Sequence, residues 1–219
     1  MKPLCVYCGI TLGTTTDHVI PSCLFIPPLP VPYPKVPACA ECNNKKSKND
    51  SYLRDMLVLD LYCSEHPVAK ELMKGKVIRS VEKNLSEIGR AVKTRLSRSP
   101  LYTGAGLYLG DYPSIPIEGE RVNELIRTMI RGLYYDQLGK RLPDDYVFDI
   151  RRQDQIYVNE VYEIMNTLGA NGPLTLGSVF GCQYLFDAKD HGISSWYLWF
   201  YGGFFLRVDT RPAKLAEAG

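Results

Sequence analysis

Apolar residues recur at intervals of three and four in several stretches of the chain, and each stretch predicts an amphipathic helix. Residues 48–62 carry leucines four apart, and we expect this helix to begin in the polar segment 43–50, with Asp50 or Ser51 as a cap near its continuation. Two more helices are predicted over 122–133 and 161–168, because a glycine and then a proline follow each pattern. The longest apolar stripe predicts a helix over 78–96 and consists of Ile78, Val81, Leu85, Ile88, Val92 and Leu96.

The last part of the chain changes to the period of two that is typical of strands. Aromatic and aliphatic residues alternate over 196–201 and 204–208, and Gly202 and Gly203 between them predict a hairpin. Residues 146–150 and 176–186 also have strand patterns. We therefore expect an α+β fold with an antiparallel sheet, and we interpret the aromatic stripe as the core of this sheet rather than as a base-stacking platform. Six prolines between Pro27 and Pro37 exclude a helix or a central strand there, so this segment is predicted to be an extended surface loop.

Composition narrows the class of protein. The 219 residues are 45% hydrophobic and 23% charged, which is ordinary for a globular domain. No apolar run is long enough for a membrane span, and the N-terminus has no signal-peptide pattern, so we expect a cytoplasmic protein without membrane contact. Seven cysteines are present, and Cys23, Cys63 and Cys182 are too scattered for a disulfide framework. We expect these three to be structural residues.

Positive charge is concentrated in one segment. The net charge of the chain is only +2, yet nine basic residues and three acidic ones lie between Lys70 and Arg98. Clustered positive charge of this kind favours a phosphate backbone as partner, whereas the alternative interpretation is a solvated helix face.

Two Cys-x-x-Cys pairs, Cys5/Cys8 and Cys39/Cys42, lie in the first fifty residues. Two tight turns of this kind can each present two sulfurs to one cation, and four thiolates complete a tetrahedral zinc site. The spacing therefore predicts a closed structural Zn²⁺ site. Such pairs alone also occur in zinc ribbons that have no catalytic activity.

Asp17 and His18 lie between the two cysteine pairs, and Asn43 and Lys46 follow the second pair. In a strand, adjacent side chains point to opposite faces, so a carboxylate can bind a metal ion while the imidazole activates a water. A carboxylate and an amide oxygen suit Mg²⁺ or Mn²⁺. Lys46 lies one helical turn after Asn43, where its ammonium could contact a phosphate.

These motifs resemble the HNH endonucleases of the ββα-metal, or His-Me finger, superfamily in their zinc-bearing form. The matching segments are residues 5–9, 17–21 and 39–47, which is roughly the first quarter of the chain. The resemblance implies His18 as general base, Asp17 and Asn43 as ligands of one catalytic Mg²⁺ or Mn²⁺, and the four cysteines as a structural Zn²⁺ site. It also implies hydrolysis of DNA phosphodiester bonds. Between His18 and Cys39 the chain has no asparagine. The resemblance implies an asparagine there that helps to hold the histidine ring, so this residue of the family pattern has no counterpart. A backbone carbonyl of the proline-rich loop is one candidate to replace it.

The resulting hypothesis divides the chain into a zinc-bound nuclease module (1–62), a basic helical segment (63–100) and an α+β domain for substrate or partner recognition (101–219). Double-stranded DNA is the expected partner, and a homodimer or a companion protein remains open. Two alternatives are a zinc ribbon that binds nucleic acid without cutting it and an effector subunit that is active only with a partner. The residues expected to bind nucleic acid are Lys45, Lys46, Lys48, Arg79, Lys83, Arg90 and Lys93.

Overall fold

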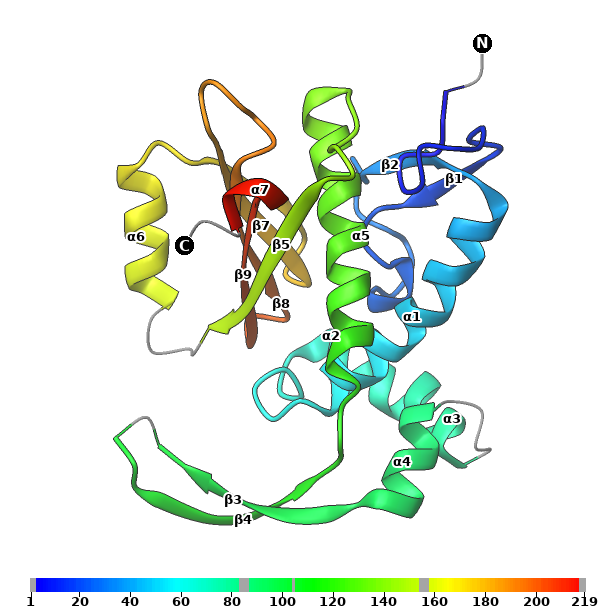
Figure 1. Ribbon diagram of the computed structural model, residues 1–219. Helices are drawn as coiled ribbons and strands as arrows, with labels where there is room; N and C mark the ends of the chain where they lie inside the picture. Colours follow the sequence, from blue (N-terminus) through cyan, green and yellow to red (C-terminus); the bar gives the residue numbers. More distant parts are fainter. Residues whose placement is uncertain (1–2, 83–86, 104, 154–157, 217–219) are drawn as a thin grey trace.

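The twenty-residue helix α5 (Gly119–Leu138) lies between the N-terminal elements and the C-terminal sheet (Figure 1). The structure is a computed structural model that describes residues 3–82, 87–103, 105–153 and 158–216. Lys83 and Leu85, which the sequence assigned to a basic amphipathic helix, lie outside the described residues. Helix α5 ends just before Gly139, the glycine that follows the predicted apolar pattern, and Gly139 has the left-handed conformation with a φ of 66°.

The N-terminal part consists of two short strands and one long helix. Strands β1 (Thr15–His18) and β2 (Lys35–Ala38) pair antiparallel, with His18 opposite Lys35. A single 3-10 turn, η1 (Ser22–Leu24), lies in the connection between them. Helix α1 (Ala40–Leu59) follows β2 directly and packs against β1 and α5.

The expected start of this helix within 43–50 is wrong, because α1 begins at Ala40 and has Cys39 as its N-cap. The sulfur of Cys39 accepts a hydrogen bond from the backbone N–H of Cys42. The first half of α1 lacked an apolar pattern because its inward face carries polar side chains, among them Lys46 and Asp50.

A group of short helices follows α1 and contains most of the basic segment. It comprises α2 (Pro67–Leu72), the π-helical turn η2 (Met73–Val77), α3 (Ile78–Glu82) and α4 (Glu87–Arg95). The described parts of the predicted helix over 78–96 are therefore helical as far as Arg95. Burial follows the predicted stripe only in part, because Ile88 is buried whereas Ile78 and Leu96 at its two ends are exposed.

Strands β3 (Ser97–Tyr102) and β4 (Tyr108–Ser114) form a hairpin that the sequence did not predict. The hairpin extends away from the rest of the molecule, below α5 in Figure 1. Its strands contain Pro100, Gly110 and Pro113, which weaken a strand pattern. Most of its side chains are exposed, so no buried face imposes an alternation of apolar and polar residues.

The C-terminal part is an antiparallel sheet, as predicted, and it has five strands. Its strands are β5 (Tyr146–Gln153), β6 (Asn171–Leu176), β7 (Phe180–Phe186), β8 (Ser194–Phe200) and β9 (Phe204–Pro212), in the order β5-β9-β8-β7-β6. The predicted strand 176–186 proves to be the end of β6, a turn and β7. The predicted hairpin is confirmed as β8 and β9. Helix α6 (Val158–Thr167) packs on the sheet through Met165, and the single turn α7 (Ala213–Ala216) follows β9.

The main buried cluster runs through the whole chain, from Val6 in the first cysteine pair to Val208 in β9. Trp196, Leu198 and Phe200 of β8 are fully buried in it, which confirms the aromatic stripe as core. Helix α5 comes close to Val19, the residue after β1, at Gly132, where an added Cβ would lie 2.7 Å from a methyl carbon of that valine. The domain boundaries expected at residues 62 and 100 stay a prediction. Within the described residues, no helix has both the length and the apolar character that a bilayer span requires.

Candidate metal centre and adjoining polar site

The two cysteine pairs come together at the N-terminus of α1. The sulfur atoms of Cys5, Cys8, Cys39 and Cys42 all lie within 4.8 Å of one another, so this group could hold a metal ion such as zinc. A tetrahedral ZnS₄ site with Zn–S bonds of about 2.3 Å has sulfur–sulfur distances of about 3.8 Å, which the cluster reaches by a small contraction. The free thiols are therefore arranged as a candidate zinc site.

Local backbone structure explains why the first pair turns so tightly. The backbone N–H of Gly9 donates to the carbonyl of Cys5 at 2.9 Å, and that of Cys5 donates to Thr11 at 2.8 Å. Gly9 has a φ of 63°, and a Cβ there would collide with the guanidinium of Arg141. Arg141 in turn donates to the carbonyl of Val6 at 3.1 Å, which attaches this turn to the chain after α5.

The surroundings of the thiols favour a charged sulfur at two of the four positions. Hydrogen bonding from the Thr11 hydroxyl, 3.4 Å from the sulfur, lowers the pKa of Cys8 to about 6. Thr11 and the backbone N–H of Cys42 also lower the pKa of Cys39. Burial raises the pKa of Cys42. Zinc binds the thiolate form of cysteine, and the lowered pKa values of Cys8 and Cys39 favour that form.

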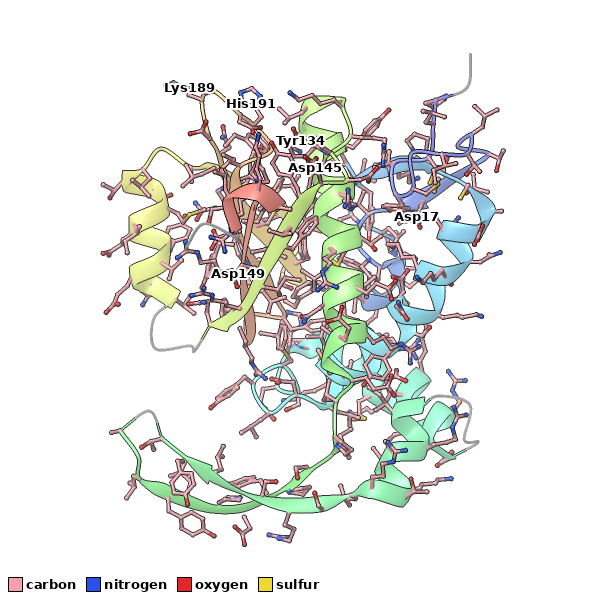
Figure 2. The ribbon with its side chains drawn as sticks, in the orientation of Figure 1. Asp17, Tyr134, Asp145, Asp149, Lys189 and His191 are labelled. Atoms are coloured by element: carbon pink, nitrogen blue, oxygen red, sulfur yellow. The ribbon has the colours of Figure 1, made fainter. Side chains whose placement is uncertain are left out.

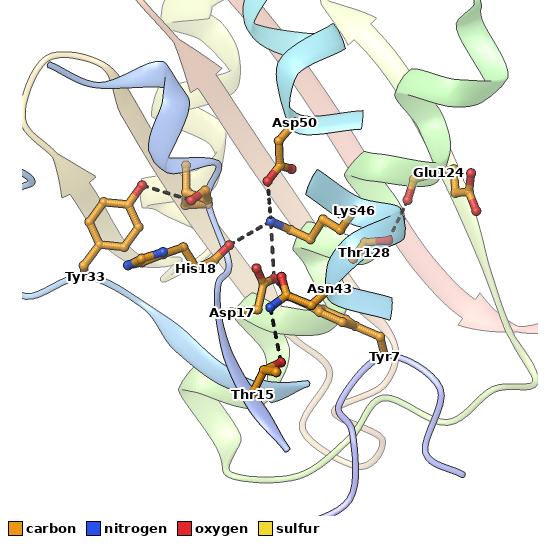
Figure 3. A network of polar contacts seen from close by, with 11 residues as sticks. Tyr7, Thr15, Asp17, His18, Tyr33, Asn43, Lys46, Asp50, Glu124 and Thr128 are labelled. Carbon is orange, nitrogen blue, oxygen red and sulfur yellow. Dashed lines mark hydrogen bonds and ion pairs between the residues drawn. The ribbon is translucent and has the colours of Figure 1, made fainter. Parts of the chain in front are cut away.

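Strand β1 carries the predicted Asp-His pair with one side chain on each face. Thr15 and Asp17 point towards α1, where their partners are Asn43 and Lys46 (Figure 3). Asn43 donates from Nδ2 to the Thr15 hydroxyl at 3.2 Å, and that hydroxyl donates to the carbonyl of Ala38 at 2.8 Å. The structure thus brings Asp17 and Asn43 to the same side of β1.

Lys46 lies at the centre of this polar site and is only 3% exposed. Its ammonium donates to the carbonyl of His18 at 2.8 Å and to Asp50 at 3.2 Å, and it forms an ion pair with Asp17 Oδ2 at 3.3 Å. The hydroxyl of Tyr7 donates to the same Asp17 oxygen at 2.5 Å. Lys46 therefore joins the backbone of β1 to two carboxylates instead of extending into solvent.

The second carboxylate of the site, that of Asp50, is affected by its burial. Burial raises the pKa of Asp50 to about 6, although the charge of Lys46 acts in the opposite direction. Oδ1 of Asp50 is buried and has no hydrogen-bond partner among the described residues. Burial and the charge of Asp17 also raise the pKa of Tyr7, so its hydroxyl keeps the proton that it donates.

Two side-chain oxygens of the site make no hydrogen bond to a described residue. Within the described part of the chain, neither Oδ1 of Asp17 nor Oδ1 of Asn43 takes part in a hydrogen bond, since Asp17 uses Oδ2 and Asn43 uses Nδ2. One carboxylate oxygen and one amide oxygen are suitable donors for a hard divalent cation.

The imidazole of His18 lies on the opposite face of β1. It meets the edge of the Tyr33 ring at 5.1 Å between ring centroids, with an angle of 81° between the planes. Partial burial and the positive charge of Lys35 lower the pKa of His18, so the ring is neutral at neutral pH. A neutral imidazole is the form that accepts a proton.

The expected nucleic-acid-binding residues divide into exposed and buried ones. Lys45, Lys48, Arg79, Arg90 and Lys93 are exposed, whereas Lys46 is buried and Lys83 lies outside the described residues. Lys45 pairs with Glu124 of α5 at 2.5 Å, and Lys93 donates to the carbonyl of Glu82 at 2.9 Å. A cavity of about 440 Å³ beside α4 is lined by three basic side chains, those of Arg90, Lys93 and Arg95.

The other two histidines do not belong to the site. His191 lies with Lys189 on the connection between β7 and β8, on the other side of α5 from Asp17 in Figure 2. His66 caps α2 and lies 3.0 Å from the Ser178 hydroxyl.

The sequence did not assign Tyr7, Tyr33 or Asp50 to the site. Asp50 lies one helical turn after Lys46, so its contact with Lys46 could have been predicted from the sequence. The two tyrosines reach the site through tertiary contacts.

Comparisons with protein-family models, with curated proteins and with solved structures found no match for this chain.

Proposed function

We propose that this protein is a metal-dependent endonuclease of the HNH type that hydrolyses DNA phosphodiester bonds. The observation that carries the proposal is the arrangement around β1, with Asp17 and Asn43 on one face and His18 on the other. A two-stranded hairpin followed by one helix, fixed at its end by four cysteines, supports the same interpretation. The proposal extends the resemblance that the sequence motifs indicated.

In this mechanism His18 acts on a water molecule. The imidazole takes one proton from the water, and the resulting hydroxide oxygen forms a bond to the phosphorus. The bond between phosphorus and the leaving sugar oxygen breaks, and that oxygen takes a proton from solvent. The lowered pKa of His18 supports this role, because the ring must be neutral before it can accept a proton.

Asp17 Oδ1 and Asn43 Oδ1 would hold the divalent cation, which supplies charge neutralisation for the phosphate when bound. Lys46 has a positioning role here, because its ammonium holds the carbonyl of His18 and one oxygen of Asp17. This assignment differs from direct phosphate contact, since the ammonium is buried. The proposed Zn²⁺ at the four cysteines would hold the start of α1, and with it Asn43, against β1.

DNA contact is proposed for the exposed basic residues Arg79, Arg90 and Lys93 of α3 and α4. Tyr52 of α1 lines the basic cavity beside α4 and lies nine residues after Asn43. Nine residues of helix correspond to about 14 Å, which is about four nucleotides along one DNA strand. A duplex that contacts both places would therefore extend several nucleotides beyond the scissile bond.

The test is cleavage of a supercoiled plasmid by the zinc-loaded protein, without divalent metal and with Mg²⁺ or Mn²⁺ added. We expect nicked or linear DNA only when the metal is present. His18→Ala should abolish cleavage, whereas His191→Ala, a control at an exposed histidine on the other side of α5, should leave it unchanged. Undiminished cleavage by the His18→Ala protein would refute the general-base assignment.

One observation favours a different function. Asp17 Oδ2 is already engaged by both Lys46 and Tyr7, which is also what a purely structural carboxylate would do. The corresponding alternative is a zinc protein that binds nucleic acid without cutting it. Salt-sensitive DNA binding with no cleavage under any divalent metal would identify it, and cleavage that requires an added companion protein would identify an effector subunit.

A further inference from the structure

His18 is attached to the protein at two points that differ in kind. Its backbone carbonyl accepts the hydrogen bond from Lys46 at 2.8 Å. Its imidazole forms no hydrogen bond to any described residue, and its aromatic contact within the described part of the chain is the T-shaped one with Tyr33. Orientation of the imidazole therefore depends on packing against that tyrosine.

Tyr33 is itself held in place. Its hydroxyl donates to the carbonyl of Ile20 at 2.9 Å, two residues after His18 in the chain. Its ring also meets Phe25 at 5.5 Å with an interplanar angle of 72°. The residue lies between Pro32 and Pro34, whose rings restrict the backbone on both sides. Because both the backbone and the hydroxyl of Tyr33 are held, its ring can restrict the orientation of the His18 ring that packs against it.

We propose that Tyr33 is a positioning residue that sets the orientation of the His18 imidazole, in a chain where no asparagine between His18 and Cys39 can do so. The inference rests on the proposed function, because the orientation matters only if His18 acts on a water. Tyr33 does not touch the reacting atoms. Its ring removes alternative side-chain rotamers of His18, and its hydroxyl fixes the ring against the loop.

Tyr33 differs in its exposure from a tyrosine of the core. Burial raises the pKa of Tyr33, but the side chain is only partly buried and packs against the main buried cluster from outside it. Tyr201 offers a matched comparison, since its hydroxyl donates to the carbonyl of Leu24 at 2.7 Å from a fully packed position. Tyr201 thus makes the same kind of bond to the same connection without contacting His18.

The experiment measures kcat and KM for plasmid cleavage and, in parallel, the ring proton signals of His18 by NMR. The chain has three histidines, so these signals are readily assigned. In Tyr33→Leu and Tyr33→Ala, kcat should fall about 100-fold with KM nearly unchanged, because a small misplacement of a catalytic group has an effect of that size. Both variants should also lose the ring-current shift of the His18 signals.

Tyr33→Phe keeps the ring and should restore the His18 signals and most of kcat, and Tyr201→Phe should change neither. The inference is overturned if the His18 signals of Tyr33→Leu and Tyr33→Ala equal those of the unaltered protein, or if kcat is unchanged while the unaltered protein cleaves DNA. If the unaltered protein cuts no substrate, the proposed nuclease function fails, and the NMR comparison alone decides whether Tyr33 orients the ring.

Discussion

Replacement of Lys46 by methionine removes a buried positive charge that three oxygens share. The ammonium lies 2.8 Å from the carbonyl of His18, 3.2 Å from Asp50 and 3.3 Å from Asp17. Methionine has a similar length and fills the same space without a charge. The substitution therefore tests the electrostatic role of Lys46 with little change in packing.

The expected loss is about 3–5 kcal/mol of unfolding free energy, which is the range for breaking a buried ion pair from one side. The side chain of Lys46 is 2% exposed, and those of Asp17 and Asp50 are 8% and 17% exposed, so water would compensate poorly for the lost partner. The neighbouring Lys45 provides the control. Its side chain is 69% exposed in its pair with Glu124, so Lys45→Met should lose less than about 1 kcal/mol.

Urea unfolding of the zinc-loaded proteins at pH 7.5, followed by circular dichroism, measures both losses. Equal slopes of free energy against urea are required before the midpoints are compared. If Lys46→Met and Lys45→Met lose the same small amount, the ammonium of Lys46 does not hold the polar site together. That result would also refute the proposed positioning of His18 by Lys46.

Three further predictions concern the metal site, helix packing and pH. Cys39→Ser should reduce bound zinc well below one ion per chain and lower the thermal midpoint by about 10 °C, whereas Cys23→Ser should keep its zinc, as metal analysis and calorimetry would report. Gly132→Ala should lose about 1–3 kcal/mol by overpacking, since its Cβ would lie 2.7 Å from a side-chain atom, while Gly119→Ala has open space and should not destabilise the protein in urea. Because burial raises the pKa of Asp50 from 3.8 to about 6, its ionisation costs stability above pH 6 and the cost is relieved as the pH falls. The unaltered protein should therefore gain about 1 kcal/mol relative to Asp50→Asn between pH 7.5 and pH 5, and a constant difference would contradict this.

The elements that bury one continuous face could be predicted from the sequence. Helix α5 and the hairpin of β8 and β9 bury one side continuously, so their apolar residues follow the period of the element. Helix α1 was read correctly only in its second half, because the inward face of its first half carries Asn43, Lys46 and Asp50. The hairpin of β3 and β4 has no buried face, so its sequence shows no alternation of apolar and polar residues that would predict strands.

The candidate site was predictable where its parts are close in sequence. Four cysteines at two short spacings predicted the cluster that the structure brings within 4.8 Å. The adjacent positions of Asp17 and His18 determined that they lie on opposite faces of a strand. Their roles in catalysis stay a prediction.

The sequence by itself determined the cysteine cluster, the glycine-terminated helices and the antiparallel character of the last strands. Each of these depends on residues a few positions apart or on one repeating period. Only the tertiary structure decided that Lys46 is buried between Asp17 and Asp50, and that Tyr33 rests against His18. Whether a charge is buried depends on which groups, distant in sequence, surround it. Because β1 and α1 meet only when the chain folds, no local sequence pattern indicates those neighbours.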